Sequence, residues 1–174
     1  MSTCDLLIIR HAKSREPDGA VADFDRPLNQ RGVDDSTLMA RIFSERLPRP
    51  DRILCSPARR SRDTAAFLVP GLIDPRRVDY PPELYLAPAS TLLDWIRATP
   101  ASSRTIMLIG HNPGLTELVN LLDGTDGPGL DNLPTLGAVH LTSSLSWAEW
   151  GARSAQRTAL VVPRTFRHRT PSAG

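Results

Sequence analysis

Leu6-Leu7-Ile8-Ile9-Arg10-His11 decides the fold of this chain, because a short apolar run stops at two side chains that can bind phosphate. The same pattern occurs twice more, as Ile53-Leu54-Cys55 before Ser56-Pro57-Ala58-Arg59-Arg60 and as Ile106-Met107-Leu108-Ile109 before Gly110-His111-Asn112-Pro113-Gly114. Such runs, bounded by turn formers, predict strands that are buried on both faces. Ligands bind outside the carboxyl ends of strands in open α/β sheets, so these strands should bring two histidines and two or three arginines to one edge. The sequence therefore predicts an anion site with a potential nucleophile, which favours phosphoryl chemistry.

Helical patterns lie between the predicted strands. An apolar stripe predicts a helix over 33–47, which Pro48 and Pro50 end. The other predicted elements are a helix from a Ser56 N-cap and Pro57 to Leu68, a short helix over 90–96, a helix from Pro113 to Leu122 capped by Asn112, and strands over 138–142 and 158–162. The stretch 74–88 is less regular. Alternation of strands and helices predicts an α/β fold, a single three-layer domain with a mostly parallel central sheet and helices on both faces.

Length and charge limit the classes of protein to which the chain can belong. Its 174 residues suit one domain, which we predict over 1–162, followed by a flexible basic tail over 163–174. The chain has 21 basic and 19 acidic residues, but three of the arginines lie in that tail, so the body is close to neutral and does not favour nucleic-acid binding. No apolar run approaches the ~18 residues of a membrane span. The first residues do not resemble a signal peptide either. We therefore expect a cytoplasmic protein, monomeric, that binds neither nucleic acid nor membrane, with Cys4 and Cys55 as small buried thiols.

The residues at the strand ends suit phosphoryl transfer without a metal. A neutral imidazole can attack a phosphoryl group when its other ring N–H donates to a backbone carbonyl, and His11 is the candidate nucleophile. Arginines neutralise nonbridging oxygens, a role open to Arg10 and Arg60, with His111 and the helix N-terminus at Pro113 across the sheet edge. The four histidines, at 11, 111, 140 and 168, lack the spacing of metal ligands, so we expect neither a metal nor another cofactor.

Five motifs resemble the histidine phosphatase superfamily, whose hallmark is an Arg-His pair after the first strand. They are Leu-Ile-Ile-Arg-His-Ala-Lys-Ser at 7–14, Asp-Arg-Pro-Leu-Asn-Gln-Arg-Gly at 25–32, Ser-Pro-Ala-Arg-Arg-Ser-Arg-Asp-Thr at 56–64, Glu-Leu-Tyr-Leu-Ala at 83–87 and Gly-His-Asn-Pro-Gly-Leu at 110–115. Within the superfamily, the chain is most similar to the small phosphohistidine phosphatases of the SixA type. The resemblance implies a phosphoglycerate mutase-like fold, transient phosphorylation of His11, and a phosphoryl group held by Arg10, Arg60 and His111.

The resemblance also bears on the residues around this set. The family's second arginine lies four residues after the serine, which selects Arg60 over Arg59. Ala12 stands where the family usually has glycine, a change compatible with activity in this branch. Lys13 and Ser14 lie near the expected pocket rim, where a solvated turn is the simpler interpretation.

The general acid is the least defined position. Many relatives place a carboxylate after the second arginine motif, and Glu83 is the matching residue, with Asp23 and Asp25 as lesser candidates. A phosphohistidine substrate would hardly need this acid, because a protonated imidazole is already a good leaving group.

The resemblance implies a phosphorylated protein, carrying phosphohistidine, as the substrate. Two alternatives stay open, which are a phosphatase of a small phosphometabolite or of phosphoserine and phosphothreonine, and a module that binds phosphate without turnover. A cysteine-based phosphatase is excluded, because the sixth residue after Cys55 is Ser61 rather than an arginine.

Overall fold

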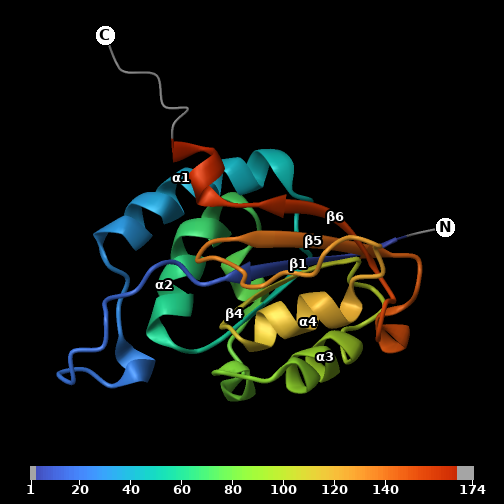
Figure 1. The fold of residues 1–174 in the computed structure, drawn as a ribbon, viewed down its shortest axis with the longest axis horizontal. Helices are drawn as coiled ribbons and strands as arrows, with labels where there is room; N and C mark the ends of the chain where they lie inside the picture. Colours follow the sequence, from blue (N-terminus) through green and yellow to red (C-terminus); the bar gives the residue numbers. More distant parts are fainter. Residues whose placement is uncertain (1–2, 168–174) are drawn as a thin grey trace, which may run out of the picture.

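A six-stranded sheet forms the centre of the computed structural model, which describes residues 3–167 of the chain. The strand order is β3-β2-β4-β1-β5-β6 (Figure 1). The strands are β1 (Cys4–Arg10), β2 (Arg52–Cys55), β3 (Val78–Asp79), β4 (Thr105–Gly110), β5 (Ala138–Ser143) and β6 (Gln156–Val161). Neighbours from β3 to β1 pair in parallel, whereas β5 is antiparallel to both β1 and β6. The prediction of a mostly parallel sheet is confirmed.

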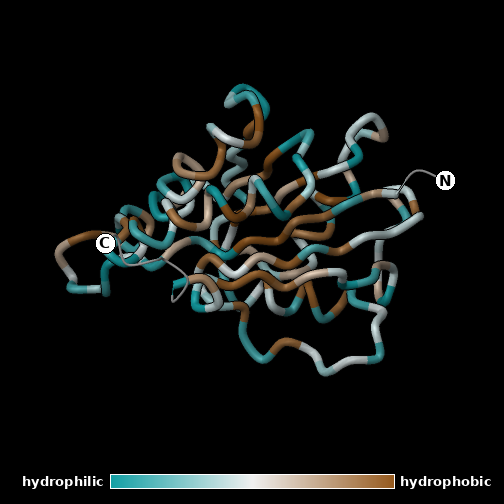
Figure 2. Tube along the Cα trace, turned by 90° about the horizontal axis from the view of Figure 1, so that it is seen from above, coloured by the Kyte–Doolittle hydropathy of each residue, from teal (hydrophilic) through white to brown (hydrophobic). Residues whose placement is uncertain are grey.

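Four helices cover the two faces of this sheet. They are α1 (Gln30–Arg46), α2 (Arg59–Leu68), α3 (Ala89–Arg97) and α4 (Gly114–Leu122). Along β1, Leu6 and Ile8 pack in the cluster that includes α3 and α4, whereas Leu7 and Ile9 pack in the cluster that includes α1 and α2. Successive side chains of a strand point to opposite faces, so a strand covered on both faces is apolar at every position. Figure 2 shows hydrophobic residues concentrated along the central strands. The predicted three-layer domain is confirmed.

The three strands that carry the motifs end together. Arg10 pairs in register with Gly110 at the ends of β1 and β4, and Cys55 at the end of β2 pairs with Ile109. The residues that follow these strands therefore leave the sheet at one edge, as the sequence predicts.

Several element boundaries differ from the prediction for local reasons. Helix α1 begins at Gln30, earlier than predicted, because the Asn29 side chain accepts the backbone N–H of Gly32 and caps the first turn. Helix α2 begins at Arg59 instead of Pro57, and Ser56 is not its N-cap. Helix α4 begins at Gly114, one residue late. The stretch 74–88 contains β3, whose two residues are too few to give a sequence pattern.

The folded body extends past residue 162. A 3-10 turn spans Pro163–Thr165, and Phe166 is only 9% exposed against the core. Arg167 forms a two-pronged ion pair with Asp35 of α1, with Nε 2.8 Å from Oδ1. Residues 163–167 are thus packed rather than a free tail, because an apolar ring and a paired charge hold them to α1. The rest of the predicted tail, including His168 and Arg169, lies outside the described residues.

Two smaller expectations can be compared with the structure. Cys4 and Cys55 are buried and free, as expected. Over residues 3–167, no helix combines the length and apolar character that a membrane crossing requires.

Candidate active site

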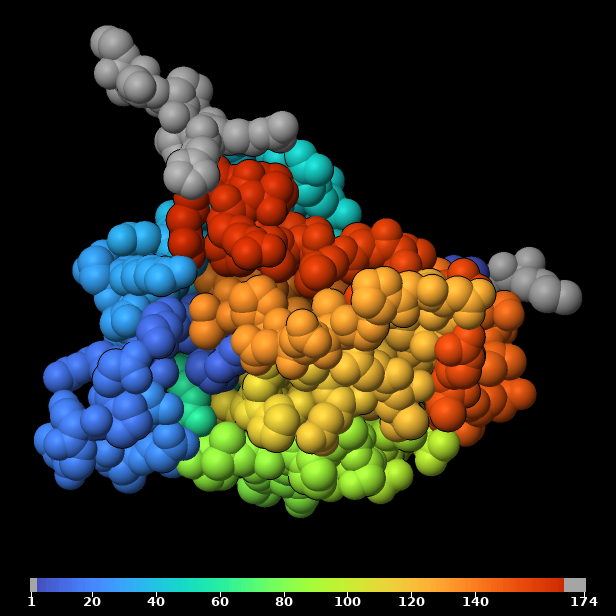
Figure 3. Space-filling view, in the orientation of Figure 1, coloured from blue at the N-terminus to red at the C-terminus, as the bar shows by residue number. Residues whose placement is uncertain are grey.

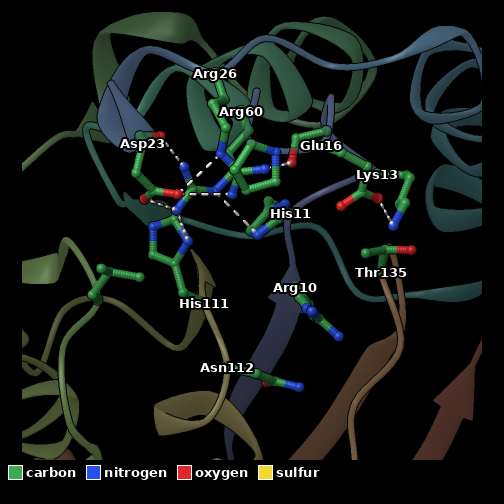
Figure 4. Close-up of a pocket in the computed structure, with 13 residues that line it drawn as sticks. Arg10, His11, Lys13, Glu16, Asp23, Arg26, Arg60, His111, Asn112 and Thr135 are labelled. Atoms are coloured by element: carbon green, nitrogen blue, oxygen red, sulfur yellow. Dashed lines mark hydrogen bonds and ion pairs between the residues drawn. The ribbon is translucent and has the colours of Figure 1, made fainter. Parts of the chain in front are cut away.

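A cavity of about 390 Å³ opens at the carboxyl ends of the strands and brings together Arg10, His11, Arg60 and His111. Figure 4 shows His11, Arg60 and His111 gathered beside Asp23, with Arg10 next to them and its guanidinium directed away from this group. The other residues that line it are Lys13, Ser14, Glu16, Pro17, Asp23, Arg26, Leu86, Asn112 and Thr135. The long segment between β1 and α1, which carries Asp23 and Arg26, projects from the body and forms one wall (Figure 3). We call residues 15–28 the strap.

His11 is held as a neutral imidazole with one nitrogen facing Arg60. The residue is 8% exposed, and its Nδ1 lies 2.7 Å from the carbonyl oxygen of Ala12, so Nδ1–H is the donor and Nε2 keeps the lone pair. Burial, with the charges of Arg60 and Arg10, lowers the pKa of His11 to about 3. A neutral ring with a fixed tautomer is the form that can attack phosphorus.

Arg60 has its guanidinium enclosed by protein groups, and the residue is only 2% exposed. Its Nε lies 3.3 Å from Nε2 of His11. NH1 donates to the backbone oxygen of Asp23 at 2.6 Å, and NH2 to the carboxylate of Asp23 at 3.0 Å. Asp23 therefore closes the solvent side of the guanidinium that should bind the phosphoryl group.

The Asp23 carboxylate has three donors. Tyr85 donates its hydroxyl at 2.7 Å, and Arg26 donates Nε at 3.0 Å, in addition to the Arg60 bond. The Tyr85 hydrogen bond, then those from Arg26 and Arg60, lower the pKa of Asp23 to about 2. Sequence reasoning gave no role to Tyr85 or Arg26, although both lie inside quoted motifs, at 83–87 and 25–32.

His111 lies beside His11, with 5.1 Å between ring centroids. Its Nδ1 is 3.3 Å from NH2 of Arg60, so Nδ1 is the acceptor, and its Nε2–H donates to Ser56 Oγ at 2.6 Å. Burial, followed by the neighbouring His11 and Arg60, lowers the pKa of His111 to about 3. Ser56 thus orients a histidine instead of capping α2.

Arg10 is fixed by the segment before β5. Its NH1 donates to the Leu133 carbonyl at 2.9 Å, and Asn112 Nδ2 donates to the same oxygen at 2.9 Å. Among the residues that the structure describes, the buried Nε of Arg10 has no partner. Arg60 and Arg26 share the single Asp23 carboxylate and Arg10 adds a further positive charge, so this part of the cavity is suited to an anion.

The remaining candidate residues lie outside the cavity or at its rim. Glu83 is exposed on the 3-10 turn Pro82–Leu84 and does not line the cavity, because that turn buries Leu84 in the core. Asp25 and Arg59 line a separate cavity on the other side of the strap. Lys13 reaches the rim, where it pairs with Glu16 at 2.7 Å. At the start of α4, Asn112 lines the cavity but Pro113 and Gly114 do not, and proline has no N–H to donate.

Within residues 3–167 there is no group of three His, Cys, Asp or Glu side chains placed to hold an ion. His140 is paired with Asp5, with Nε2 2.7 Å from Oδ1, on the sheet away from the cavity. The cationic side chains that line the cavity are Arg10, Arg26, Arg60 and Lys13, and Lys13 is paired with Glu16.

Comparisons of sequence identify relatives of this chain. A family profile described as the histidine phosphatase superfamily (branch 1) matches residues 6–79. An uncharacterized protein of Mycobacterium tuberculosis is 34% identical over 163 residues, which cover 90% of this chain and 100% of that protein.

Comparisons of structure give similar folds. A protein assigned as the phosphohistidine phosphatase SixA of Nakamurella multipartitia superposes with a TM-score of 0.82 at 26% identity, covering 94% of this chain and 98% of that one. The protein histidine phosphatase SixA complexed with tungstate superposes with a TM-score of 0.78 at 23% identity, covering 94% of this chain and 99% of that one. At 23% identity, the similarity to this second protein shows a shared fold and nothing more.

Proposed function

The chain belongs to the histidine phosphatase superfamily, branch 1, and we propose that it is a metal-independent phosphatase working through a transient phosphohistidine on His11. The observation that carries the proposal is the state of His11. Its Nδ1–H is anchored on a backbone carbonyl, its ring is neutral, and its Nε2 faces a buried arginine. These are the properties that a nitrogen nucleophile needs.

The proposed reaction has two transfers at one phosphorus. Arg10, Arg60 and His111 hold the phosphoryl oxygens, and Nε2 of His11 attacks phosphorus as the bond to the leaving group breaks. The leaving group keeps that electron pair and takes a proton. Water then attacks the phosphohistidine, the nitrogen–phosphorus bond breaks, and inorganic phosphate leaves with His11 neutral again. The arginines stabilise the equatorial charge in both steps.

The preferred substrate is a protein phosphohistidine. The structural similarity to SixA supports this choice, and so do two features of the cavity. Glu83 lies outside the cavity, and the carboxylates inside it are engaged, Asp23 by Arg60 and Glu16 by Lys13. A site without a free acid suits a leaving group that needs little protonation, such as imidazole, better than an alkoxide. A small phosphometabolite, or phosphoserine and phosphothreonine, is the second candidate.

The test is to trap the intermediate. Rapid-quench labelling with a radioactive phosphodonor should give an acid-labile, base-stable adduct on His11, and His11→Ala should lower turnover roughly a thousandfold or more. His140→Ala is the matched control, because it removes a histidine that is paired on the sheet away from the cavity. Tungstate, which the fold relative SixA binds, should compete with substrate. Substantial turnover by the His11 variant would refute the proposal, and binding without turnover by the wild type would indicate a phosphate-binding module.

A further inference from the structure

One buried hydroxyl connects the segment that follows β1 to helix α2. Thr64, in α2, has no exposed surface, and its Oγ1 accepts the backbone N–H of Ala12 at 2.9 Å. The same oxygen donates to the backbone carbonyl of Arg60 at 2.7 Å. Ala12 is the residue whose carbonyl anchors Nδ1 of His11. Thr64 therefore joins the helix turn that carries Arg60 to the residue that fixes the nucleophile.

Packing alone does not account for a threonine at this position. The next residue, Ala65, belongs to the apolar cluster that also contains Ala12. Valine has nearly the same shape and would avoid burying a hydroxyl, and a hydroxyl that bonds back to the preceding turn slightly weakens a helix. What valine would lack is an acceptor for Ala12. Over residues 3–167, Thr64 is the acceptor that this buried N–H has.

We propose that Thr64 is a positioning residue for the phosphoryl transfer. By holding Ala12 it fixes the carbonyl that keeps the proton of His11 on Nδ1, so that the lone pair stays on Nε2 beside Arg60. Thr64 does not line the cavity and does not touch the phosphoryl group, so its effect passes through His11. The inference rests on the proposed function, in which His11 is the nucleophile.

A positioning role makes a specific kinetic prediction. Asp23 anchors the guanidinium of Arg60, and the Leu133 carbonyl anchors that of Arg10. Because neither anchor involves Thr64, Thr64→Val should leave KM within about twofold. Small displacements of a reacting atom cost up to about a hundredfold in rate. We therefore expect kcat, and the single-turnover rate of phosphorylation of His11, to fall about ten- to a hundredfold. Thr64→Ser retains the hydroxyl and should recover most of that rate.

The control separates positioning from the loss of a buried hydroxyl. Thr99 is also buried and donates Oγ1 to a carbonyl one turn earlier, that of Trp95 at 3.3 Å, but it is not in the cavity lining. Thr99→Val should keep kcat within about twofold of wild type. If Thr64→Val and Thr99→Val change kcat and the melting temperature equally, the role of Thr64 is structural and the proposal is wrong.

A second readout does not depend on turnover. In protein labelled with ¹⁵N-histidine, the wild type should show His11 as the Nδ1–H tautomer with a hydrogen-bonded, slowly exchanging proton. Thr64→Val should broaden or lose that signal, and Thr64→Ala serves the same purpose should the valine variant not fold. An unchanged signal would overturn the positioning role, even if all activity were lost. Activity retained in His11→Ala would instead overturn the proposed function and leave the tautomer result standing.

Discussion

Nε of Arg60 lies 3.3 Å from Nε2 of His11, so a guanidinium rests against the nitrogen that is expected to attack. Asp23 holds the same guanidinium from the opposite side through its backbone oxygen and its carboxylate. An arriving phosphoryl group must share or replace these contacts. In the resting site, the carboxylate of the strap thus occupies donors that the substrate needs.

Removing this internal competitor should strengthen anion binding. Asp23→Asn takes one negative charge from the cavity, so the inhibition constants of phosphate and tungstate should fall about three- to tenfold at low ionic strength. Asp25→Asn is the matched control, because Asp25 is in the same 3-10 turn but does not line this cavity. Weaker inhibition in the Asp23 variant would mean that Asp23 chiefly positions Arg60.

The two buried histidines should make stability depend on pH. Their pKa values are about 3 in the folded protein against an ordinary 6.5, so the unfolded chain binds protons first as pH falls. Their contribution is complete above pH 6.5 and is lost progressively between pH 6.5 and 3, by up to about 1.4 kcal/mol per pH unit for each histidine. Urea unfolding at pH 7, 6 and 5 should show this fall, with a shallower slope in His11→Gln and in His111→Gln. Slopes in both variants equal to that of the wild type would contradict the assignment.

Turnover should not require a divalent ion. The groups proposed to hold the phosphoryl oxygens are Arg10, Arg60 and His111, which all line the cavity, so dialysis against a strong chelator should leave kcat/KM within about twofold. An activity that is lost on chelation and restored by a divalent cation would show that the electrophile is a metal.

Glu83 can be tested as the general acid with two leaving groups. Glu83→Gln should lower kcat/KM less than about tenfold on phosphohistidine, because imidazole leaves readily and the carboxylate is outside the cavity. The same preparation should be assayed on an alkyl phosphoester, for which we also expect a small change. A loss of about a hundredfold on the ester would restore Glu83 as the acid and require this turn to close on the substrate.

We expect Leu86 to lower the stability of the folded protein and to contact a protein substrate. It has a left-handed backbone, with φ at 49°, and is 52% exposed while lining the cavity, so it gains neither a relaxed backbone nor burial. Leu86→Asn should raise the melting temperature by about 2–4 °C and increase KM for a protein substrate. Leu160→Asn is the control, since Leu160 is similarly exposed on β6 without this backbone strain. Equal changes of melting temperature in the two variants would contradict this interpretation.

The sequence predicts the sheet edge and its central residues because strand runs and strand-end motifs are local patterns. Arg10, His11 and His111 follow directly from such runs, and their meeting depends only on parallel pairing. The role of Ser56 could not be predicted, because Ser-Pro at a helix start fits an N-cap equally well. Asp23 and Tyr85 meet across 62 positions of sequence, and no periodicity encodes a contact between a projecting segment and a turn.

The pairing of β1 with β4 has a consequence for how this protein can change. His11 and His111 each follow a residue of one parallel pair, Arg10 and Gly110, and the His11 N–H bonds to the Gly110 oxygen at 3.1 Å. Their ring centroids are 5.1 Å apart, close to the ~4.8 Å between neighbouring strands of any sheet. The pairing of the two main chains therefore sets the distance between the two rings. Core side chains can be exchanged, and the melting temperature can rise or fall with them, while the distance between the two imidazole rings stays the same.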